Sequence, residues 1–469
     1  MCGIVGYIGT KKASPILING LLKLEYRGYD SAGISTIEND SISVMKDKGR
    51  VKNLYDLDGI NDLVGTVGIA HTRWATHGKP SKQNAHPHLD NTNTFCVVHN
   101  GIIENHNELK EFLKDNGYTF YSETDTEVIP NLISYYYKKG NDFLKSVSLT
   151  CNDLKGSYSI EVICKDFPDN MVVARKDSPL VIGKAENETF ISSDIPALIS
   201  FTNTFYFLND NEMAYISKDD IKFYDNNLNE LSKELTTVEL SADSADKDGF
   251  EDYMLKEIFE QPKAIRETIG TSLNGSRIHF EGLNLTKDYL STINKIYMIA
   301  CGTAMHAGLG VKSNFETLCN IPVTVEVASE FRYRNPLIDD KTLCIYISQS
   351  GETADTIAAL KLAKSKGAKT IAVTNVIESS ITREADYFVY THAGPEIAVA
   401  STKAYTSQLV LLNIMALYFA ETLESCSQHR IDNIKKEILK LSEKAEEILE
   451  NTEIIKEIAK KISSQKYMF

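Results

Sequence analysis

Two rhythms of apolar and polar residues divide this chain of 469 residues. From residue 1 to about 240, short apolar runs separated by turn residues indicate many short strands. From about 293 onward, apolar strands alternate with segments of helical periodicity, which is typical of right-handed βαβ units. The pattern therefore predicts a layered α+β domain followed by an α/β domain with a parallel sheet between helices.

In the first region we expect sheets covered by helices that come in separate blocks. Helical spacing is found at 14–24, 107–116, 125–139 and 142–154. Strands are expected at 4–8, 42–45, 67–71, 95–99, 157–163, 171–175, 181–184, 190–193, 213–216 and 221–224.

The second region follows Ser241–Gly249, a stretch with almost nothing to bury that predicts a surface linker. A helical stripe over Phe250–Glu260 halts at Pro262 and then continues, which indicates a connecting helix. Strands are expected at 295–300, 323–327, 342–347, 370–374 and 387–391, with helices at 304–318, 354–366 and 402–423. The charged segment 430–463 predicts an amphipathic helix, and 466–469 begins a strand-like run. We expect boundaries that give a domain at 1–240, a linker and connecting helix at 241–290, a domain at 291–425 and a helical start of a further unit at 426–469.

Charge and cysteine usage narrow the class of protein. The 50 Lys and Arg against 64 Asp and Glu give a net charge of −14, which disfavours nucleic acid and anionic membranes as partners. The apolar run Leu409–Ala420 is short and interrupted by Asn413, so it predicts a buried helix and not a membrane span. No charged segment followed by an apolar one precedes the first strand, and we expect a cytoplasmic protein. The scattered cysteines predict neither a disulfide framework nor a zinc site: Cys2, Cys96, Cys151, Cys164, Cys301, Cys319, Cys344 and Cys426.

Cys2 is the first candidate for chemistry. If Met1 is removed, the thiol and a free α-amino group belong to the same residue, so the nucleophile carries its own base. An α-amino group titrates near ~7.7–8.0 and is partly neutral at the pH of a cell. The alternative is an ordinary residue at a frayed terminus.

Three further clusters in the first region suit attack on an amide. Asn100-Gly101 offers a side-chain amide and an unobstructed backbone N–H, the two donors typical of an oxyanion hole. Arg73 suits a carboxylate, and Asp125 suits an ammonium group. Taken singly, these residues would also fit a tight turn, a surface ion pair and a helix N-cap.

Metal and cofactor chemistry are not indicated by the sequence. Several histidines of this region would suit a metal, but they show no HExxH or Cys/His ligand spacing: His71, His77, His86, His88 and His99. We expect neither a metal nor a cofactor.

The second region carries three hydroxyl-rich loops placed at strand ends or helix starts. They are Cys301–Thr303, Ser348–Thr353 and Val399–Thr402. Hydroxyls and free N–H groups at a helix start hold a phosphate without a basic residue. Around one parallel sheet the three loops could converge on one ligand, so we expect a phosphosugar.

These residues resemble a known family. Cys2–Gly6, Leu24–Asp30, His71–His77, Val98–Gly101 and Ser122–Glu127 are similar, in the same order, to the glutaminase region of the glutamine–fructose-6-phosphate aminotransferase family. The resemblance implies an αββα N-terminal-nucleophile fold, a type 2 glutamine amidotransferase domain, for the first region. It implies that Cys2 is the nucleophile, and that Asn100 and Gly101 are the oxyanion donors.

The resemblance also assigns the glutamine pocket. It implies that Arg73 binds the α-carboxylate, that Asp125 binds the α-amino group, and that Thr76 and His77 surround them. Trp74 resembles the mobile gate of the family's ammonia route.

The second region resembles the first sugar-isomerase (SIS) domain of the same family, including Lys256–Pro262 and Glu326–Arg334. The implied sugar-phosphate binders are Thr303, Ser348, Gln349, Ser350, Thr353, Val399 and Ser401. Ala304 departs from members with serine there, which leaves one phosphate contact in doubt. The family continues into a second SIS domain with the Schiff-base lysine, the base glutamate and a closing tail, and Lys403 is not given that lysine's role. We expect glutaminase without synthase activity from this chain, and a homodimer for the complete protein.

Two other functions stay open at this point. Another amidotransferase with the same first domain would need a phosphoribosyl-binding strand and loop or a Ser-Gly-Gly ATP loop, and neither is found. A sugar-phosphate-sensing module with a vestigial glutaminase site would retain Met1 and leave Cys2 unreactive.

Overall fold

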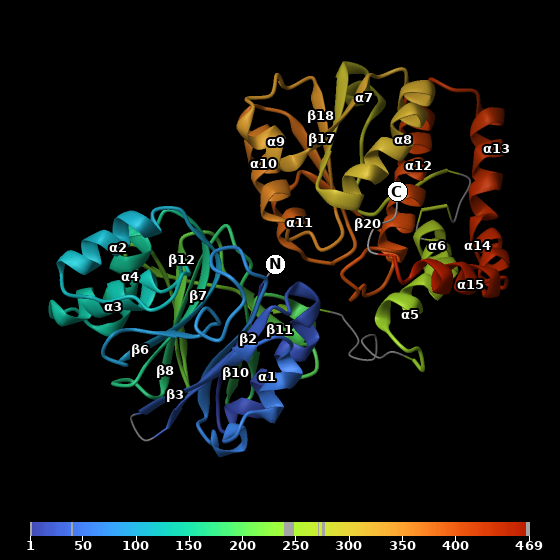
Figure 1. Cartoon of the computed structure of the whole chain (residues 1–469). Helices are drawn as coiled ribbons and strands as arrows, with labels where there is room; N and C mark the ends of the chain where they lie inside the picture. The colour runs from blue at the N-terminus through green and yellow to red at the C-terminus, as the bar shows by residue number, and fades with distance from the viewer. Residues whose placement is uncertain (1, 39–40, 239–247, 271, 274–276, 466–469) are drawn as a thin grey trace. The chain divides into compact units, whose positions relative to one another are not determined.

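The computed structural model describes residues 2–38, 41–238, 248–270, 272–273 and 277–465. The chain divides into two compact units, Met1–Asp243 and Ser244–Phe469, which are described separately (Figure 1). Most of the predicted linker at 241–249, and the strand-like run at 466–469, lie outside the described residues.

The first sheet of the first unit is antiparallel throughout, and β1 (Gly3–Ile8) lies in its middle between β10 and β4. The alternation of β1 explains its place, since Val5 and Tyr7 pack under a helix while Ile4 and Ile8 face the second sheet. In spatial order the strands are β15 (Thr236–Thr237), β11 (Thr204–Phe207), β9 (Val181–Ala185), β10 (Glu188–Ser192), β1, β4 (Val67–Arg73), β2 (Ser31–Glu38) and β3 (Ser41–Lys48).

The second sheet of this unit is also antiparallel. In spatial order its strands are β14 (Glu230–Leu231), β13 (Ile221–Asp225), β12 (Glu212–Ser217), β8 (Asn170–Lys176), β7 (Gly156–Cys164), β6 (Phe95–Ile103) and β5 (His88–Leu89).

Helices cover the outer faces of both sheets and complete four layers, αββα (Figure 1). One apolar cluster lies between α1 (Ala13–Leu24) and the first sheet, one between the sheets, and one beneath the helices of the second sheet. Those helices are α2 (His106–Asp115), α3 (Val128–Lys138) and α4 (Phe143–Asp153), and short 3-10 turns span Glu25–Arg27, Val51–Asp56, Ile60–Asp62 and Ile195–Ala197.

The second unit is built on a parallel sheet in the order β17 (Val323–Val327), β16 (Lys295–Ala300), β18 (Thr342–Ser348), β19 (Lys369–Thr374) and β20 (Tyr387–Tyr390). Helices pack on both faces, as Figure 1 shows. They are α5 (Tyr253–Phe259), α6 (Gln261–Gly270), α7 (Lys287–Thr292), α8 (Gly302–Cys319), α9 (Ala328–Tyr333), α10 (Ala354–Ser365), α11 (Ser380–Glu384) and α12 (Lys403–Leu423).

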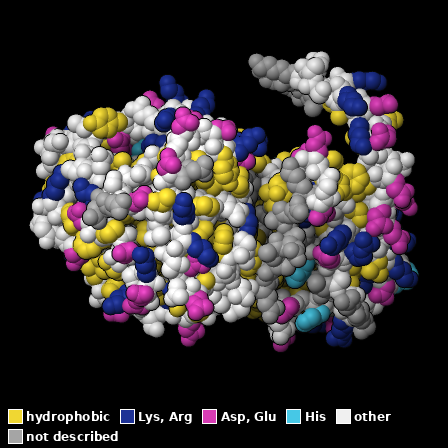
Figure 2. Space-filling view, turned by 90° about the horizontal axis from the view of Figure 1, so that it is seen from below, with side chains coloured by type: hydrophobic (Ala, Val, Ile, Leu, Met, Phe, Trp, Pro, Cys, Tyr) yellow, Lys and Arg dark blue, Asp and Glu magenta, His cyan; other side chains and the backbone are white. Residues whose placement is uncertain are grey.

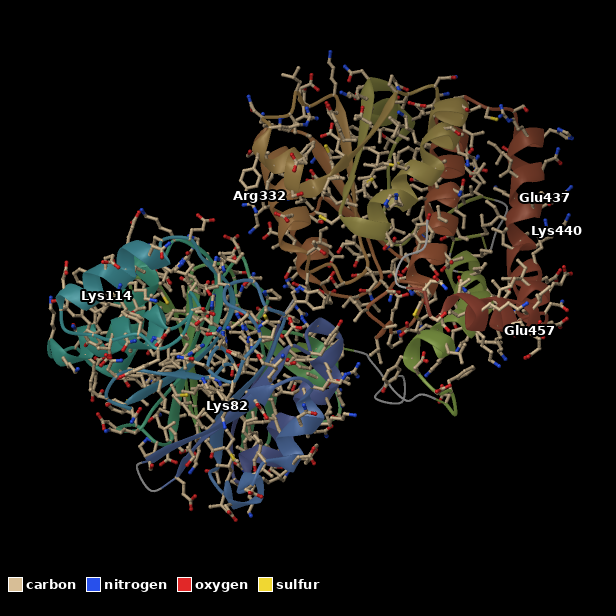
Figure 3. The ribbon with its side chains drawn as sticks, in the orientation of Figure 1. Lys82, Lys114, Arg332, Glu437, Lys440 and Glu457 are labelled. Carbon is tan, nitrogen blue, oxygen red and sulfur yellow. The ribbon has the colours of Figure 1, made fainter. Side chains whose placement is uncertain are left out.

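The helix α12 is long and apolar enough to cross a membrane by length and composition, but 61% of its apolar window is buried. It packs into the core beneath the parallel sheet, as a core helix does. Three helices follow: α13 (Gln428–Leu439), α14 (Leu441–Leu449) and α15 (Glu453–Ile462). Glu437 and Lys440 project from the α13 end and form an ion pair at 2.7 Å (Figure 3). No side chain of α15 is buried.

The predicted fold class is confirmed for both units, while local elements differ in several places. The amphipathic helix predicted over 430–463 is divided into α13, α14 and α15, and β11 was not predicted. Three differences lie near the predicted site. The strand predicted at 95–99 continues to Ile103, because β7 pairs with it as far as Gly156. The helix predicted from residue 125 begins at Val128, since residues 122–127 form a turn held by side chains. The strand β2 was not predicted, because Ser31–Glu38 mixes small and polar residues that are nevertheless buried.

Candidate active site

Cys2 lies directly before the central strand β1. Its Sγ accepts a hydrogen bond from the backbone N–H of Trp74 at 3.3 Å and lies 3.4 Å from the Trp74 carbonyl oxygen. The Cys2 carbonyl oxygen accepts from Arg27 Nε and from Asn100 Nδ2, each at 3.1 Å. Because β1 pairs with β4 from Gly3↔Thr72 onward, the register itself brings the thiol to the end of β4.

The positive charge of Arg27, next to Cys2, is held in place by a buried ion pair. Arg27 Nη1 lies 3.0 Å from Asp194 Oδ2, and both side chains are largely buried. Burial raises the pKa of the Cys2 thiol, while the Trp74 N–H and the charges of Arg73 and Arg27 lower it by smaller amounts. The thiol therefore needs a base before it can act as a nucleophile.

Asn100 and Gly101 lie on β6 and not in a turn. The Asn100 carboxamide donates one N–H to the Cys2 carbonyl, and its Oδ1 is buried with no hydrogen-bond partner among the described residues. Gly101 has φ +134°, and a Cβ there would stand 2.0 Å from the Ser157 carbonyl oxygen. Only glycine fits this position, and its backbone lies beside the Asn100 amide.

Arg73 ends β4 with a buried guanidinium. Its Nη2 donates to the carbonyl oxygens of His77 and Gly78, the latter at 3.1 Å. Its Nη1 is buried and has no hydrogen-bond partner in the described part of the chain. A buried, unpaired guanidinium nitrogen is costly unless a ligand anion completes it.

Asp125 lies in the turn before α3, not at its N-cap. Its Oδ2 accepts from the backbone N–H of Ile103 at 2.8 Å, which ties the turn to the end of β6. The turn is fixed by Glu127, whose carboxylate accepts from the N–H groups of Tyr121 and Ser122. The charges of Asp125 and Cys2 both raise the pKa of Arg73, while its burial, the largest influence, lowers it.

The remaining predicted pocket residues follow β4. Trp74 is 40% exposed, so it is not a core residue, and it makes an edge-on contact with Tyr29 at 5.7 Å between ring centroids. Thr76 is exposed. His77 packs edge-on against His106 at 5.3 Å, and its Nδ1 is buried without a partner among the described residues.

Four other histidines, His71, His86, His88 and His99, lie close together in the first unit. His71 and His86 stack at 4.0 Å, and His86 meets His88 at 4.9 Å between ring centroids. His99 Nδ1 lies 2.9 Å from Thr126 Oγ1, which links β6 to the turn that carries Asp125. No group of three or more His, Cys, Asp or Glu residues that could hold a metal is found among the described residues.

In the second unit, two of the predicted sugar-phosphate loops lie side by side. β16 and β18 are neighbours in the parallel sheet, so Thr303 and the 348–353 loop leave the same edge. Ser348 Oγ accepts from the Gly351 N–H at 3.0 Å and lies 3.2 Å from Thr353 Oγ1, and Ser350 Oγ accepts from the Glu352 N–H at 3.2 Å. The Gln349 carbonyl oxygen accepts a hydrogen bond from the backbone N–H of Asn375 at 3.1 Å.

The third loop reaches that edge through a strap over residues 394–402. Asn375 Nδ2 donates to the Gly394 carbonyl at 2.7 Å, and Glu257 accepts from the N–H groups of Ile397 and Ala398. Ser401 donates to Glu396 at 3.0 Å, and Val399 is 61% exposed. Lys403, which follows, is buried and pairs with Glu260 at 2.6 Å.

Four further residues touch the site but were not singled out from the sequence: Arg27, Asp194, His71 and Thr126. Arg27 lies within the quoted segment Leu24–Asp30, whereas nothing in the sequence pairs it with a residue 167 positions away. A cavity of about 640 Å³ also opens beside β3 and β5, lined by residues that include Lys46, His88 and Glu127, and none of the predicted site residues lines it.

Comparisons with known proteins match both units. A glutamine amidotransferase domain model matches residues 71–200, and a SIS domain model matches residues 289–418. The glutamine–fructose-6-phosphate aminotransferase (isomerizing) of Clostridium tetani is 53% identical over 470 residues, covering 100% of this chain and 77% of that protein. The protein of the same name from Thermococcus kodakarensis is 44% identical over 472 residues, covering 100% of this chain and 77% of its own length.

Solved structures are also similar. The C-terminal domain of glucosamine-fructose-6-phosphate aminotransferase from Francisella tularensis is 38% identical, covers 47% of this chain and 62% of that chain, and has a TM-score of 0.45. A glutamine phosphoribosylpyrophosphate amidotransferase from B. subtilis is 17% identical, covers 83% and 90% of the two chains, and has a TM-score of 0.45.

Proposed function

This chain belongs to the glutamine–fructose-6-phosphate aminotransferase family, and from that premise we propose that it hydrolyses glutamine at Cys2 to supply ammonia for fructose 6-phosphate. In the complete reaction, glutamine and fructose 6-phosphate give glutamate and glucosamine 6-phosphate, the entry to amino-sugar synthesis. The chain spans 77% of the length of the relative from Clostridium tetani.

The first step needs a deprotonated sulfur. Because burial raises the pKa of the Cys2 thiol, the sulfur does not ionise unaided at neutral pH. Removal of Met1 leaves the Cys2 α-amino group as the nearest base, with a pKa of about 7.7–8.0. The amine takes the thiol proton as Sγ bonds to the carboxamide carbon of glutamine, and the negative charge moves to the amide oxygen.

Collapse of the tetrahedral intermediate breaks the C–N bond and releases ammonia as the amine returns the proton. Water then hydrolyses the thioester to glutamate. The second N–H of the Asn100 carboxamide and the Gly101 backbone N–H are proposed to hold the oxygen anion. Arg73 Nη1, buried and unpaired, fits the substrate α-carboxylate, and Asp125 fits the α-amino group, while Thr76 and His77 line the pocket and Trp74 gates it.

The second unit is proposed to bind the phosphosugar. The 348–353 loop precedes α10, a helix of 12 residues, and Thr303 lies in the first turn of α8, a helix of 18 residues. The hydroxyls and free N–H groups at these two helix starts would bind one phosphate together. Ser348, Gln349, Ser350, Thr353 and Thr303 would hold the phosphate end, and Val399 and Ser401 the sugar. Acidic and basic side chains are interspersed over the face seen in Figure 2, so local geometry, and not a basic surface, would attract the anion.

For a chain of these 469 residues we expect glutaminase activity without synthase activity, because the family's Schiff-base lysine and base glutamate belong to a further domain. A cytoplasmic location and a homodimer of the complete protein complete the proposal. All eight cysteines are free thiols, which suits a reducing compartment.

One observation carries the proposal: Cys2 directly precedes strand β1 and its carbonyl bonds the Asn100 carboxamide, while the neighbouring strand β4 ends at Arg73, whose Nη1 is buried without a partner among the described residues. The test is to incubate the purified chain with glutamine and follow glutamate, and separately to add fructose 6-phosphate and follow glucosamine 6-phosphate. We expect glutamate in both cases and glucosamine 6-phosphate in neither. Appreciable glucosamine 6-phosphate would overturn the expected loss of synthase activity.

Intact mass separates this proposal from a sugar-phosphate sensor with a vestigial site. Loss of Met1, together with a single adduct of a glutamine-analogue electrophile on Cys2, supports the enzyme. A retained Met1 and an unlabelled Cys2 would favour the sensor.

A further inference from the structure

The strap over residues 394–402 forms neither helix nor strand, so its backbone N–H groups are not paired in a regular ladder. Carboxylates accept from them instead. Glu396, within the strap, accepts from the Ser401 hydroxyl at 3.0 Å and from the N–H groups of Thr402 and Ala404 at 2.8 and 3.1 Å. These bonds close the end of the strap onto the start of α12.

Glu257 holds the strap from outside it. This residue lies on α5, about 140 positions earlier in the chain, and is 2% exposed. Its Oε1 accepts from the N–H groups of Ile397 at 2.5 Å and Ala398 at 3.0 Å, and its Oε2 lies 3.3 Å from Ala398 N. Hydrogen bonds from a backbone N–H to a carboxylate are stronger than those between neutral groups, so one buried side chain fixes two successive residues of the strap.

The residues that follow on the α5–α6 corner reach α12 and not the strap. Glu260 Oε2 pairs with Lys403 Nζ at 2.6 Å, and Gln261 Oε1 accepts from Thr406 Oγ1 at 2.6 Å. Lys403 and Thr406 both lie on α12. The corner is therefore anchored to α12 through its own pairs, and Glu257 adds a hold on the strap.

Val399 stands between the two sets of carboxylate bonds. Glu257 holds the backbone directly before it, and Glu396 holds the backbone a few residues after it. Val399 itself is exposed. A loop that is held on both sides of an exposed residue keeps that residue's direction before a ligand arrives, which lessens the entropy lost on binding.

Resting on the phosphosugar binding proposed above, we infer that Glu257 is a positioning residue whose carboxylate holds the strap so that Val399 and Ser401 face the sugar end of fructose 6-phosphate. The bonds of Glu257 go to the strap and not to the 348–353 loop, where the phosphate is proposed to bind. Its loss should therefore weaken binding of the phosphosugar and leave binding of phosphate alone intact.

Glu257→Ala tests this division between the two ends of the ligand. The substitution leaves two backbone N–H groups without their acceptor, and we expect fructose 6-phosphate to bind about 30-fold more weakly, as measured by calorimetry. Inorganic phosphate is the probe for the phosphate end, and its affinity, followed by phosphorus NMR, should stay within about 2-fold.

Two further variants separate the hydrogen bonds from the general stability of α5. Glu257→Gln keeps an oxygen that accepts from both N–H groups, so we expect fructose 6-phosphate affinity within about 5-fold of the unsubstituted chain. Asp252→Ala is the matched control, because it removes a carboxylate that accepts from the Leu255 N–H at 2.8 Å, a bond within α5 and not to the strap. It should leave the affinity within about 2-fold.

Several results would overturn the inference. Equal losses of affinity for fructose 6-phosphate and for inorganic phosphate in Glu257→Ala would mean that the whole unit is deformed. An unchanged fructose 6-phosphate affinity in Glu257→Ala, or an equal loss in Asp252→Ala, would remove the role of the strap contact. Glu257→Gln binding no better than Glu257→Ala would show that an acceptor oxygen at this position does not matter.

A measurement on the unsubstituted chain remains if the variants do not fold. Hydrogen exchange followed by NMR reports directly on the amides of Ile397 and Ala398. We expect both to exchange about 10-fold or more slowly than in an unstructured peptide, and free exchange at both would refute the inference. If the unsubstituted chain binds neither fructose 6-phosphate nor inorganic phosphate, the proposed phosphosugar binding itself has failed, and the inference falls with it.

Discussion

At the scale of single residues, Glu161 is a buried carboxyl group without a partner among the described residues. Its side chain on β7 is 0% exposed, and neither carboxylate oxygen has a hydrogen-bond partner among the described residues. It faces β1, where a Cβ on Gly6 would stand 2.6 Å from Glu161 Oε2. Burial without a partner disfavours the charged form and raises the pKa of Glu161 well above its ordinary value of 4.5.

Glu161→Gln should remove a pH-dependent loss of stability. The folded pKa lies above the unfolded value of 4.5, so the contribution of Glu161 is intact below pH 4.5 and is lost as the pH rises toward the folded pKa. Within that window the free energy of unfolding should fall by about 1.4 kcal/mol per pH unit relative to Glu161→Gln. Urea unfolding followed by the fluorescence of Trp74, the single tryptophan, measures the first unit at pH 6 and pH 8. If the free energy of unfolding changes equally with pH in the two chains, this account is wrong.

At the scale of elements, β6 joins the oxyanion donors to the rest of the site. It pairs with β7 along its whole length, its end is tied to Asp125, and its carbonyl at His99 accepts from His71. A shift of this one strand would move Asn100, Gly101 and Asp125 together.

Gly101→Ala should damage both stability and activity. Placing a residue with a side chain at φ +134° lowers the free energy of unfolding by about 1–3 kcal/mol. The clash between the new Cβ and the Ser157 carbonyl lowers it further, because β7 must move away. Gly117→Ala is the control, since Gly117 also has positive φ, +86°, but open space around its Cβ. Denaturant unfolding should show a larger loss for Gly101→Ala, with glutaminase activity lost only there. Equal losses in the two variants would show that β6 tolerates the side chain.

Ser348→Ala tests the loop between β18 and α10. Its hydroxyl accepts from the Gly351 N–H, so the substitution leaves that donor unpaired as well as removing a phosphate contact. We expect calorimetry to show fructose 6-phosphate binding weakened by about 1–3 kcal/mol. Ser365→Ala, at the far end of α10, should leave the affinity as it is. An unchanged affinity in Ser348→Ala would place the phosphate elsewhere.

At the scale of the whole molecule, each unit has its own apolar cores. Those of the first unit involve residues up to Val238, and those of the second begin at Ile265. The chemistry proposed for Cys2 and the binding proposed for Ser348 therefore rest on separately stabilised frameworks.

Cys2→Ala should abolish glutamine hydrolysis and leave fructose 6-phosphate affinity within about 2-fold, because the substitution is confined to the first unit. Paired glutaminase assays and calorimetry on both chains measure this. An equal loss of both activities would mean that Cys2 is needed for folding. Stimulation of glutaminase by fructose 6-phosphate in the unsubstituted chain would show that the two sites communicate.

The elements that were predicted most accurately are those set by the local pattern of apolar and polar residues. The five parallel strands of the second unit were predicted to within about a residue, because buried apolar runs bounded by turns leave little ambiguity. β2 escaped prediction since Ser31 and Ser35 are small polar residues buried without hydrogen-bond partners among the described residues, a situation that periodicity does not encode. The extension of β6 through Asn100 and Gly101 depends on pairing with β7, more than 50 residues later.

The candidate site shows the same division. Short segments suggested Cys2, Arg73, Asn100 and Asp125 as site residues, and this assignment stays a prediction. The hydrogen bond from Arg27 to Cys2 and the one from His71 to the His99 carbonyl form only when distant parts of the chain are brought together. Residues that hold others in place leave no local signal, because their partners lie far away in the chain.

The position of β1 in the middle of its sheet has a practical consequence for anyone producing this protein. An affinity tag or fusion partner placed ahead of Cys2 would keep its nitrogen in a peptide bond and block access by methionine aminopeptidase. If Cys2 and the 348–353 loop act as proposed, such material would bind phosphosugar but would not hydrolyse glutamine. A purification handle therefore belongs at the opposite terminus, and a tagged batch should be assayed only after its leader has been cleaved flush with Cys2.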